Sequence, residues 1–142
     1  MSQEFDLQRF VRAQDEGGTY EQALGELRRG RKVSHWMWFV FPQLAGLGRS
    51  STARYYAVGS LAEAQAYLAH PVLGARLREC AAVLVGLRGR RAEEVLGGVD
   101  ALKLRSSMTL FARAAPDEPV FAEVLERYFP GPDPATERLL GE

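Results

Sequence analysis

Aromatic rings, cations and glycines are concentrated in one stretch of the sequence, residues 31–50. The segment SHWMWFVFPQL (34–44) contains both tryptophans of the chain, a histidine and two phenylalanines. Basic residues precede this segment, and the glycine-containing sequence LAGLGRS (44–50) follows it. Rings can stack a planar base, whereas cations and free backbone N–H groups can hold a phosphate. This composition is typical of a site for a planar, anionic ligand.

Each polar residue of this stretch has a candidate role in such a site. Trp36 or Trp38 would stack the ring, and His35 is the candidate general acid–base residue. Gln43 would contact a polar group of the ligand. The cations and hydroxyl groups that would hold its phosphate or carboxylate are Arg31, Lys32, Ser34, Arg49 and Ser50. The sequence GLGRS matches no known phosphate-binding motif, because it lacks the spacing and terminal lysine of a P-loop.

A second polar segment, KLRSSMT (103–109), lies far along the chain. On a helix, Lys103, Ser106 and Ser107 share one face. We predict that 31–50 and 103–107 converge on one cleft, where Lys103 and a serine hydroxyl complete the pocket. No acid or histidine lies in local register with either serine, so a serine nucleophile would need a base from elsewhere. Alternatively, the two serines are small residues that permit close helix packing.

The aromatic segment also has interpretations that involve no small ligand. Its rings would be core residues, and the basic run before it would be a solvated helix end, where cations are favoured. As a further alternative, 34–44 forms a protein–protein interaction surface, because tryptophan and arginine are favoured at interfaces. That hypothesis requires an exposed apolar patch or a homodimer that buries both tryptophans.

Two basic runs, RRGRK (28–32) and RGRR (88–91), raise the question of nucleic acid. Eighteen basic and eighteen acidic residues cancel to a net charge of zero, and no nucleic-acid-binding motif is present, which argues against that partner. Nucleic-acid binding would need both runs on one face and an affinity that depends strongly on salt.

Helical periodicity dominates the sequence and predicts the elements that position these residues. We predict an all-α domain of six to eight helices with short loops. One helix runs from Thr19 to a stop at Gly30, and Ser60 with Glu63 forms a capping box before the next clear pattern. Asp100 is predicted to cap a helix over 101–114, with Leu104, Met108 and Phe111 on its apolar face. The segments 36–41 and 54–58 are the candidates for one or two very short strands.

Length and composition limit the remaining possibilities. The chain has 142 residues, which suits one domain with a core from about residue 6 to residue 140. One cysteine and two histidines provide neither a disulfide nor a structural zinc site, and we predict no metal and no cofactor. The longest apolar runs are too short to span a bilayer. The lone cysteine and the absence of an apolar signal region predict a cytoplasmic protein.

Three long motifs carry a family resemblance. SHWMWFVFPQLAGLGRS (34–50), HPVLGARLREC (70–80) and DALKLRSSMTLFA (100–112) resemble the bacterial and fungal family known as domain of unknown function 1810. The resemblance extends from about Leu7 to Leu140 and implies a compact, predominantly helical single domain. It brings no established activity and no catalytic residue.

A weaker resemblance, in the order of the aromatic-rich segment, the alanine-rich helix and the D-x-x-K helix, is to NADAR-type domains. These domains are linked to ADP-ribose and related nucleotide metabolism, so the resemblance implies an ADP-ribose derivative as a candidate ligand. Together, the residues and the resemblances predict a domain that binds a small anionic, nucleotide-like molecule. Neither assigns a reaction.

Overall fold

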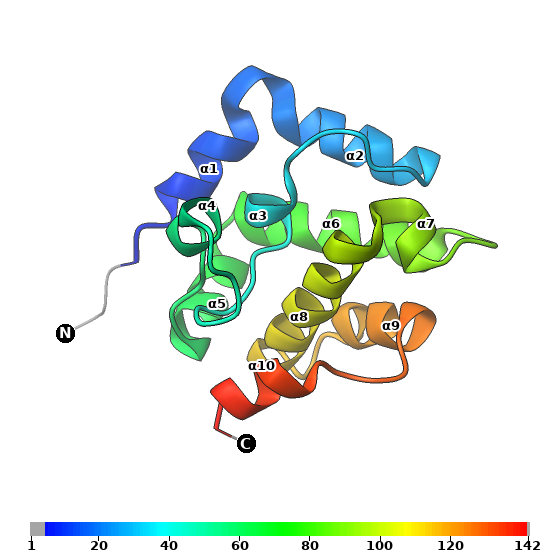
Figure 1. Cartoon of the computed structure of the whole chain (residues 1–142). Coiled ribbons are helices and arrows are strands. Elements are labelled where there is room, and N and C mark those ends of the chain that lie inside the picture. Colours follow the sequence, from blue (N-terminus) through cyan, green and yellow to red (C-terminus); the bar gives the residue numbers. More distant parts are fainter. Residues whose placement is uncertain (1–4, 142) are drawn as a thin grey trace.

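The structure is a computed structural model that describes residues 5–141. Its described part is helical (Figure 1), which confirms the predicted all-α class. Six helices have eight or more residues: α1 (Gln8–Asp15), α2 (Thr19–Arg29), α5 (Leu61–Ala69), α6 (Leu73–Gly86), α8 (Gly98–Ala114) and α9 (Pro119–Tyr128). Shorter helices are α3 (Met37–Val40), α4 (Ser51–Tyr55), α7 (Ala92–Leu96) and α10 (Pro134–Leu139), and a 3₁₀ turn covers Glu16–Gly18.

The two candidate strand segments form little β structure. Residues 36–41 fold mainly into α3, and residues 54–58 begin at the end of α4. Within residues 5–141, β pairing is limited to one isolated parallel bridge between Leu44 and Val58. The aromatic and β-branched composition of these segments therefore reflects their burial, because Val40, Phe41 and Val58 are core residues.

Helix α8 runs through the middle of the molecule, from α7 toward α10 (Figure 1). It packs against α5, α7, α9 and α10. The predicted apolar face is fully buried, since Leu104, Met108 and Phe111 have no exposed surface. The ring of Phe111 lies 5.3 Å from that of Tyr67 and 6.0 Å from that of Phe121, measured between centroids. With neighbours on several sides, α8 separates two regions of the molecule that differ in character.

The predicted helix ends are right in part. Gly30 ends α2 with a left-handed φ of 77°, a conformation that glycine adopts without strain. Ser60 accepts a hydrogen bond from the Glu63 N–H, but the Glu63 carboxylate accepts from Gly59 and not from the backbone of Ser60. The prediction for Asp100 is wrong: α8 begins at Gly98, and the Asp100 carboxylate pairs with lysines and does not cap the helix.

None of the described helices has the length and apolar character that a bilayer span requires.

Candidate functional site

The start of the aromatic segment is held against α2 by one buried carboxylate, that of Glu26. Its Oε1 accepts hydrogen bonds from the backbone N–H groups of Val33 (2.8 Å) and Ser34 (3.0 Å). The indole Nε1 of Trp36 donates to the same oxygen at 2.8 Å, and the Ser34 hydroxyl donates to Oε2. One side chain on α2 thus fixes four donors of the segment 33–36.

The pKa of Glu26 reflects the hydrogen bonds that its carboxylate accepts. Burial raises the pKa, but the hydrogen bonds from Ser34, Val33 and Trp36 outweigh burial and lower it from 4.5 to about 2. Glu26 is therefore ionised at neutral pH, although its side chain is almost fully buried. Sequence analysis missed this residue, because a glutamate on a helix is usually a solvated surface group.

The candidate residues at positions 35, 36 and 38 have different environments. Trp36 is fully buried, so its ring is a core element and has no face open to a ligand. Trp38 and Ser34 are half-buried, and His35 is exposed. Within the described chain, the imidazole of His35 has no hydrogen bond or ion pair, whereas Ser34 before it and Trp36 after it both donate hydrogen bonds to Glu26. Of the two tryptophans, Trp38 is therefore the one that is partly exposed.

Lys32 and Lys103 are the chain's two lysines, and both approach the carboxylate of Asp100. Lys32 Nζ lies 2.9 Å from Oδ2, and Lys103 Nζ lies 3.6 Å from Oδ1. Each ammonium also stands over an indole ring: Lys32 is 5.2 Å from the centroid of Trp36, and Lys103 is 5.0 Å from that of Trp38. We call these five residues the lysine–tryptophan cluster. Two positive charges against one negative charge leave it with an excess of one positive charge.

The two lysines of the cluster are held with different strength. The side chain of Lys32 is 8% exposed, and its backbone N–H donates to the Val95 carbonyl at 2.7 Å. The side chain of Lys103 is 23% exposed, and its 3.6 Å contact with Asp100 is too long for a good hydrogen bond. Lys103 is therefore held by Asp100 more weakly than Lys32 is.

The cavity beside Lys103 is nearly filled. Its lining includes Trp38, Gln43, Gly48 and Tyr56, and it holds about 10 Å³, which is room for about one water molecule. The backbone of 43–45 is pinned to Val58, because Ala45 N–H donates to the Val58 carbonyl (2.8 Å) and Val58 N–H to the Gln43 carbonyl (2.9 Å).

The loop that follows this cavity is packed closely against α4. Its far end is fixed where Ser50 caps α4 by accepting from Ala53 N–H at 3.1 Å. A Cβ added at Gly48 would stand 2.5 Å from the Cβ of Ala53. Arg49 is exposed on this loop.

The structure brings some of the predicted residues together and separates others. Lys103 reaches the segment 31–50, with Trp38 and Gln43 beside it. Ser106 is directed toward the start of α10 instead, and its hydroxyl lies 3.2 Å from both the Leu102 carbonyl and the Asp133 carboxylate. Ser107 is fully buried, and its hydroxyl has no partner in the described residues. The exposed side chain of Arg31 makes no ion pair in the same part of the chain.

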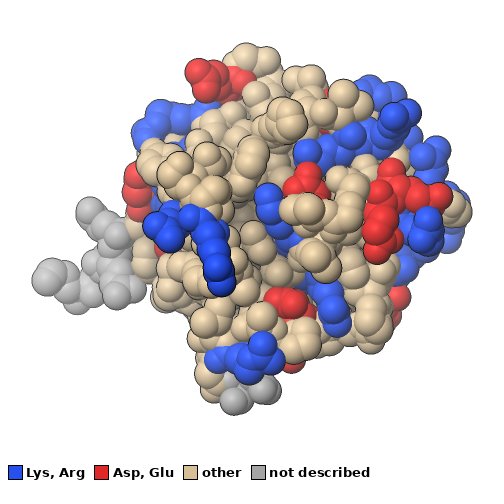
Figure 2. Space-filling model, viewed as in Figure 1, with Lys and Arg blue, Asp and Glu red and all other residues tan. Residues whose placement is uncertain are grey.

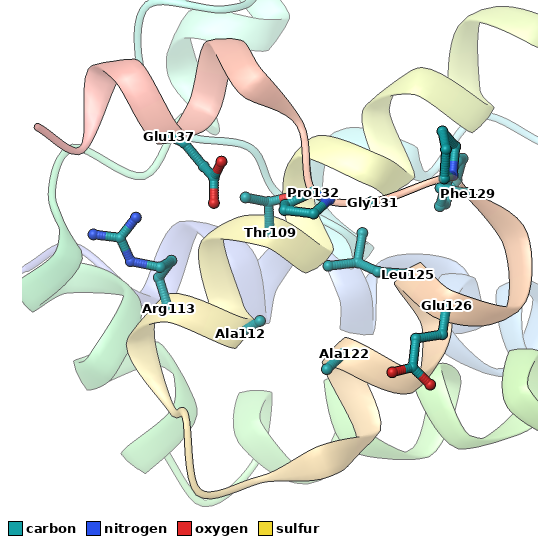
Figure 3. Close-up of a pocket in the computed structure, with 11 residues that line it drawn as sticks. Thr109, Ala112, Arg113, Ala122, Leu125, Glu126, Phe129, Gly131, Pro132 and Glu137 are labelled. Carbon is teal, nitrogen blue, oxygen red and sulfur yellow. The ribbon is translucent and has the colours of Figure 1, made fainter. Parts of the chain in front are cut away.

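A roomier pocket lies on another side of α8, between α8, α9, α10 and the loop 129–133 (Figure 3). Its volume is about 330 Å³. Arg113 of α8 and Glu137 of α10 lie on one side, and Phe129 with Glu126 of α9 lies on the other (Figure 3). The remaining lining is mainly small or apolar: Thr109, Ala112, Ala122, Leu125, Pro130, Gly131 and Pro132. We call it the α8–α10 pocket.

Sequence analysis did not find the α8–α10 pocket, because its residues are ordinary core and loop types. The signal that could have pointed to it is the sequence FPGPDP (129–134), whose prolines cannot continue a helix. The Arg105 guanidinium holds this loop by donating to the carbonyls of Gly131 (2.9 Å) and Pro132 (3.0 Å). Asp133 N–H donates to Thr109 Oγ1 at 2.8 Å, so the pocket is built on a fixed loop.

Comparison with known families identifies the chain. The family described as "Protein of unknown function (DUF1810)" matches residues 4–140. The chain belongs to the DUF1810 family. The resemblance carried by the three sequence motifs is thereby confirmed. A crystal structure of a conserved hypothetical protein of Mycobacterium tuberculosis, Rv1873, is similar to this DUF1810 chain with a TM-score of 0.93. The two share 52% sequence identity, over 97% of this chain and 98% of the other. The comparison with curated proteins found no match.

Proposed function

We propose that this DUF1810 domain binds a small anionic, nucleotide-like molecule at the lysine–tryptophan cluster. The observation that carries the proposal is the convergence of both lysines of the chain on one carboxylate, with an indole ring beside each ammonium. An ADP-ribose derivative is the ligand that the weaker resemblance suggests. Its phosphates match the excess positive charge, and its base matches the half-buried indole of Trp38.

In this proposal, Asp100 occupies the place of a ligand anion between the two ammonium groups. A phosphate that approaches the cluster competes with Asp100 for Lys103, whose contact of 3.6 Å is the weaker one. When Lys103 turns to the phosphate, its ammonium leaves the face of Trp38 and the ring becomes free to stack the base. Lys32 stays paired with Asp100 and keeps the carboxylate neutralised.

The ligand approaches at the mouth of the cluster, but the cavity of about 10 Å³ is far smaller than the roughly 300 Å³ of the smallest ordinary ligand pockets. Binding therefore needs an outward movement of the loop between the two fixed points at Leu44 and Ser50. Gln43, Arg49 and Ser50 border this loop and supply its polar contacts. His35, exposed beside the cluster, is the proposed acid–base residue if the ligand is turned over.

A second candidate function is self-association through the surface next to the cluster. Val33 and Val99 are each 70% exposed and Leu102 is 65% exposed, and all three adjoin residues of the cluster in the chain. Exposed aliphatic side chains beside arginines are typical of interaction surfaces. Light scattering after gel filtration tests this candidate: a dimer that Val33→Ser and Leu102→Ser dissociate supports it, and a monomer at all concentrations excludes it.

A thermal-shift panel tests the ligand proposal. ADP-ribose, NAD, ATP and nucleoside monophosphates are each added to the wild type, to Lys103→Met and to Arg138→Met. Methionine keeps much of the side-chain volume and removes the charge, and Arg138 is an exposed control on α10. A ligand at 100 times its Kd stabilises by about 2.7 kcal/mol, which raises Tm by about 5–10 °C for a domain of this size.

The expected result is a shift for one ligand class that Lys103→Met abolishes and Arg138→Met leaves unchanged. A flat panel at millimolar concentration would overturn the proposal. A shift that survives Lys103→Met but disappears in Ala122→Leu would move the ligand to the α8–α10 pocket, which Ala122 lines.

A further inference from the structure

The two basic runs of the sequence meet in the structure, although sixty positions separate their centres. The Arg90 guanidinium donates to the Gly30 carbonyl at 3.2 Å. A Cβ at Gly30 would lie 3.3 Å from the Arg90 Cζ. The Arg90 side chain therefore packs over Gly30 at the end of α2, where the glycine has no side chain. The convergence that nucleic-acid binding required, both runs on one surface, is therefore present at the end of α2.

Six arginines form this surface, and all of them are exposed. We call it the arginine surface; it consists of Arg28, Arg29, Arg31, Arg88, Arg90 and Arg91. The loop that carries Arg88 and Arg90 protrudes from the molecule between α6 and α7 (Figure 1). Its position at the edge makes the surface accessible to a large partner.

The arginine surface keeps a positive excess in spite of neighbouring acids. Basic side chains are most frequent on the right-hand side of Figure 2, over the end of α2 and over α7, with acidic side chains among them. Arg28 pairs with Glu79 at 3.6 Å and Arg91 with Glu94 at 3.8 Å, and such long, exposed pairs are weak. Within the part of the chain that the structure describes, Arg29, Arg31 and Arg88 have no ion pair. The zero net charge of the chain therefore conceals a local excess.

We propose that the arginine surface binds the phosphate backbone of double-stranded nucleic acid without reading its sequence. Arginine forms bidentate hydrogen bonds to phosphate oxygens and remains charged at all relevant pH values. The two basic runs that supply these arginines contain no aromatic residue, so they lack the rings on which single-stranded bases stack. Contacts of this kind position a protein on a duplex and carry no base specificity.

This surface is separate from the proposed ligand site. Lys32, which ends the first basic run, is tied to Asp100 and 8% exposed, so it belongs to the cluster and not to the arginine surface. A failure of either proposal leaves the other standing, because Lys103→Met tests the first and arginine substitutions test the second.

Fluorescence anisotropy with a labelled duplex tests the proposal. The full chain is titrated into duplex DNA, duplex RNA and the matching single strands, at salt concentrations between about 50 and 200 mM. The slope of log K against log salt is about −0.9 for each phosphate contact on a DNA duplex, so six contacts would give about −5. The informative variant is Arg29→Gln/Arg88→Gln, with one unpaired arginine removed from each run. The matched control is Arg54→Gln/Arg138→Gln, two exposed arginines on α4 and α10.

The expected result is duplex binding that weakens with salt, with a slope reduced in magnitude by about 2 in the Arg29→Gln/Arg88→Gln variant and unchanged in the control. Circular dichroism melting of both variants verifies the fold. Among residues 5–141, the side chains of Arg29 and Arg88 have no hydrogen-bond or ion-pair partner that the substitutions would remove. Three outcomes would overturn the proposal: no duplex binding at low salt, equal losses in both variants, or tighter binding to the single strands than to the duplex.

Discussion

The lysine–tryptophan cluster and the α8–α10 pocket both lie against α8, but they differ in their chemical groups and in their empty volume. The cluster has two ammonium groups, a carboxylate and two indoles, but the cavity beside it holds about 10 Å³. The pocket has about 330 Å³ of space, and its lining is mainly small and apolar, with charges at the side. Chemical groups and room therefore occur on different sides of α8. Residue types alone therefore predict which chemical groups a site contains, but not whether it has room for a ligand.

The difference arises from how each region fills its own volume. Around the cluster, large rings and aliphatic side chains pack densely, since Trp36 and its neighbours Met37, Val40 and Phe41 are buried. In the pocket, the proline-containing loop after α9 is hydrogen-bonded to Arg105 and Thr109 of α8, and the small side chains of the lining leave space between them. A region that is held by internal hydrogen bonds resists change, whereas a region with empty volume tolerates it. Four predictions test this contrast.

The largest effect is expected where the closed region is held together, at Glu26. Replacing Glu26 with Gln removes the charge and leaves one acceptor oxygen for four donors. We expect the free energy of unfolding to fall by about 3 kcal/mol. Urea titration of this variant and of Glu21→Gln, an exposed neighbour on α2, measures the difference. A loss below about 1 kcal/mol would show that Glu26 does not organise the segment.

Low pH should lower the free energy of unfolding of the wild type, because it protonates the same carboxylate. Because the pKa of Glu26 is lowered in the folded state, the ionised carboxylate adds to the free energy of unfolding. This contribution is complete above about pH 4.5 and is lost as the pH falls through about 2. A shift from 4.5 to about 2 corresponds to about 3 kcal/mol. Urea titrations from pH 6 to pH 2 on the wild type and Glu26→Gln should therefore converge in acid. Curves that stay parallel would contradict the assignment.

Matched enlargements compare the room in the two regions directly. Gly48→Ala places a Cβ 2.5 Å from the Cβ of Ala53 and should destabilise by about 1–3 kcal/mol. Ala122→Leu adds more atoms to the α8–α10 pocket, where space is available, and should stay within about 0.5 kcal/mol of the wild type. Thermal unfolding of the two variants gives the comparison. Equal costs would mean that the two regions do not differ in packing.

The smallest effect concerns the charge balance of the cluster. Asp100→Asn removes the carboxylate between the two lysines and should cost about 1 kcal/mol of stability. It should also increase the rise in Tm that inorganic phosphate produces at constant ionic strength. Adding Lys103→Met to this variant should cancel the increase. If phosphate stabilises Asp100→Asn no more than the wild type, Asp100 does not act as the resident anion.

The sequence by itself determined the all-α class, the stop of α2 at Gly30, the buried face of α8 and the family. These features depend on residues within about four positions of one another, or on long motifs, so periodicity and glycine placement suffice to predict them. The residue types of the cluster were also visible in the sequence, since Lys32, Trp38 and Lys103 were all candidate site residues.

Only the tertiary structure decided how these groups are used. It turned Asp100 from a predicted helix cap into the partner of two lysines, buried Trp36 and directed Ser106 toward α10. It also gave Glu26 its four donors and brought Arg90 onto Gly30. Pairs of this kind join residues that are distant in the chain, and their geometry follows from how helices and loops pack. Local propensity carries no information about that packing, nor about the volume it leaves empty.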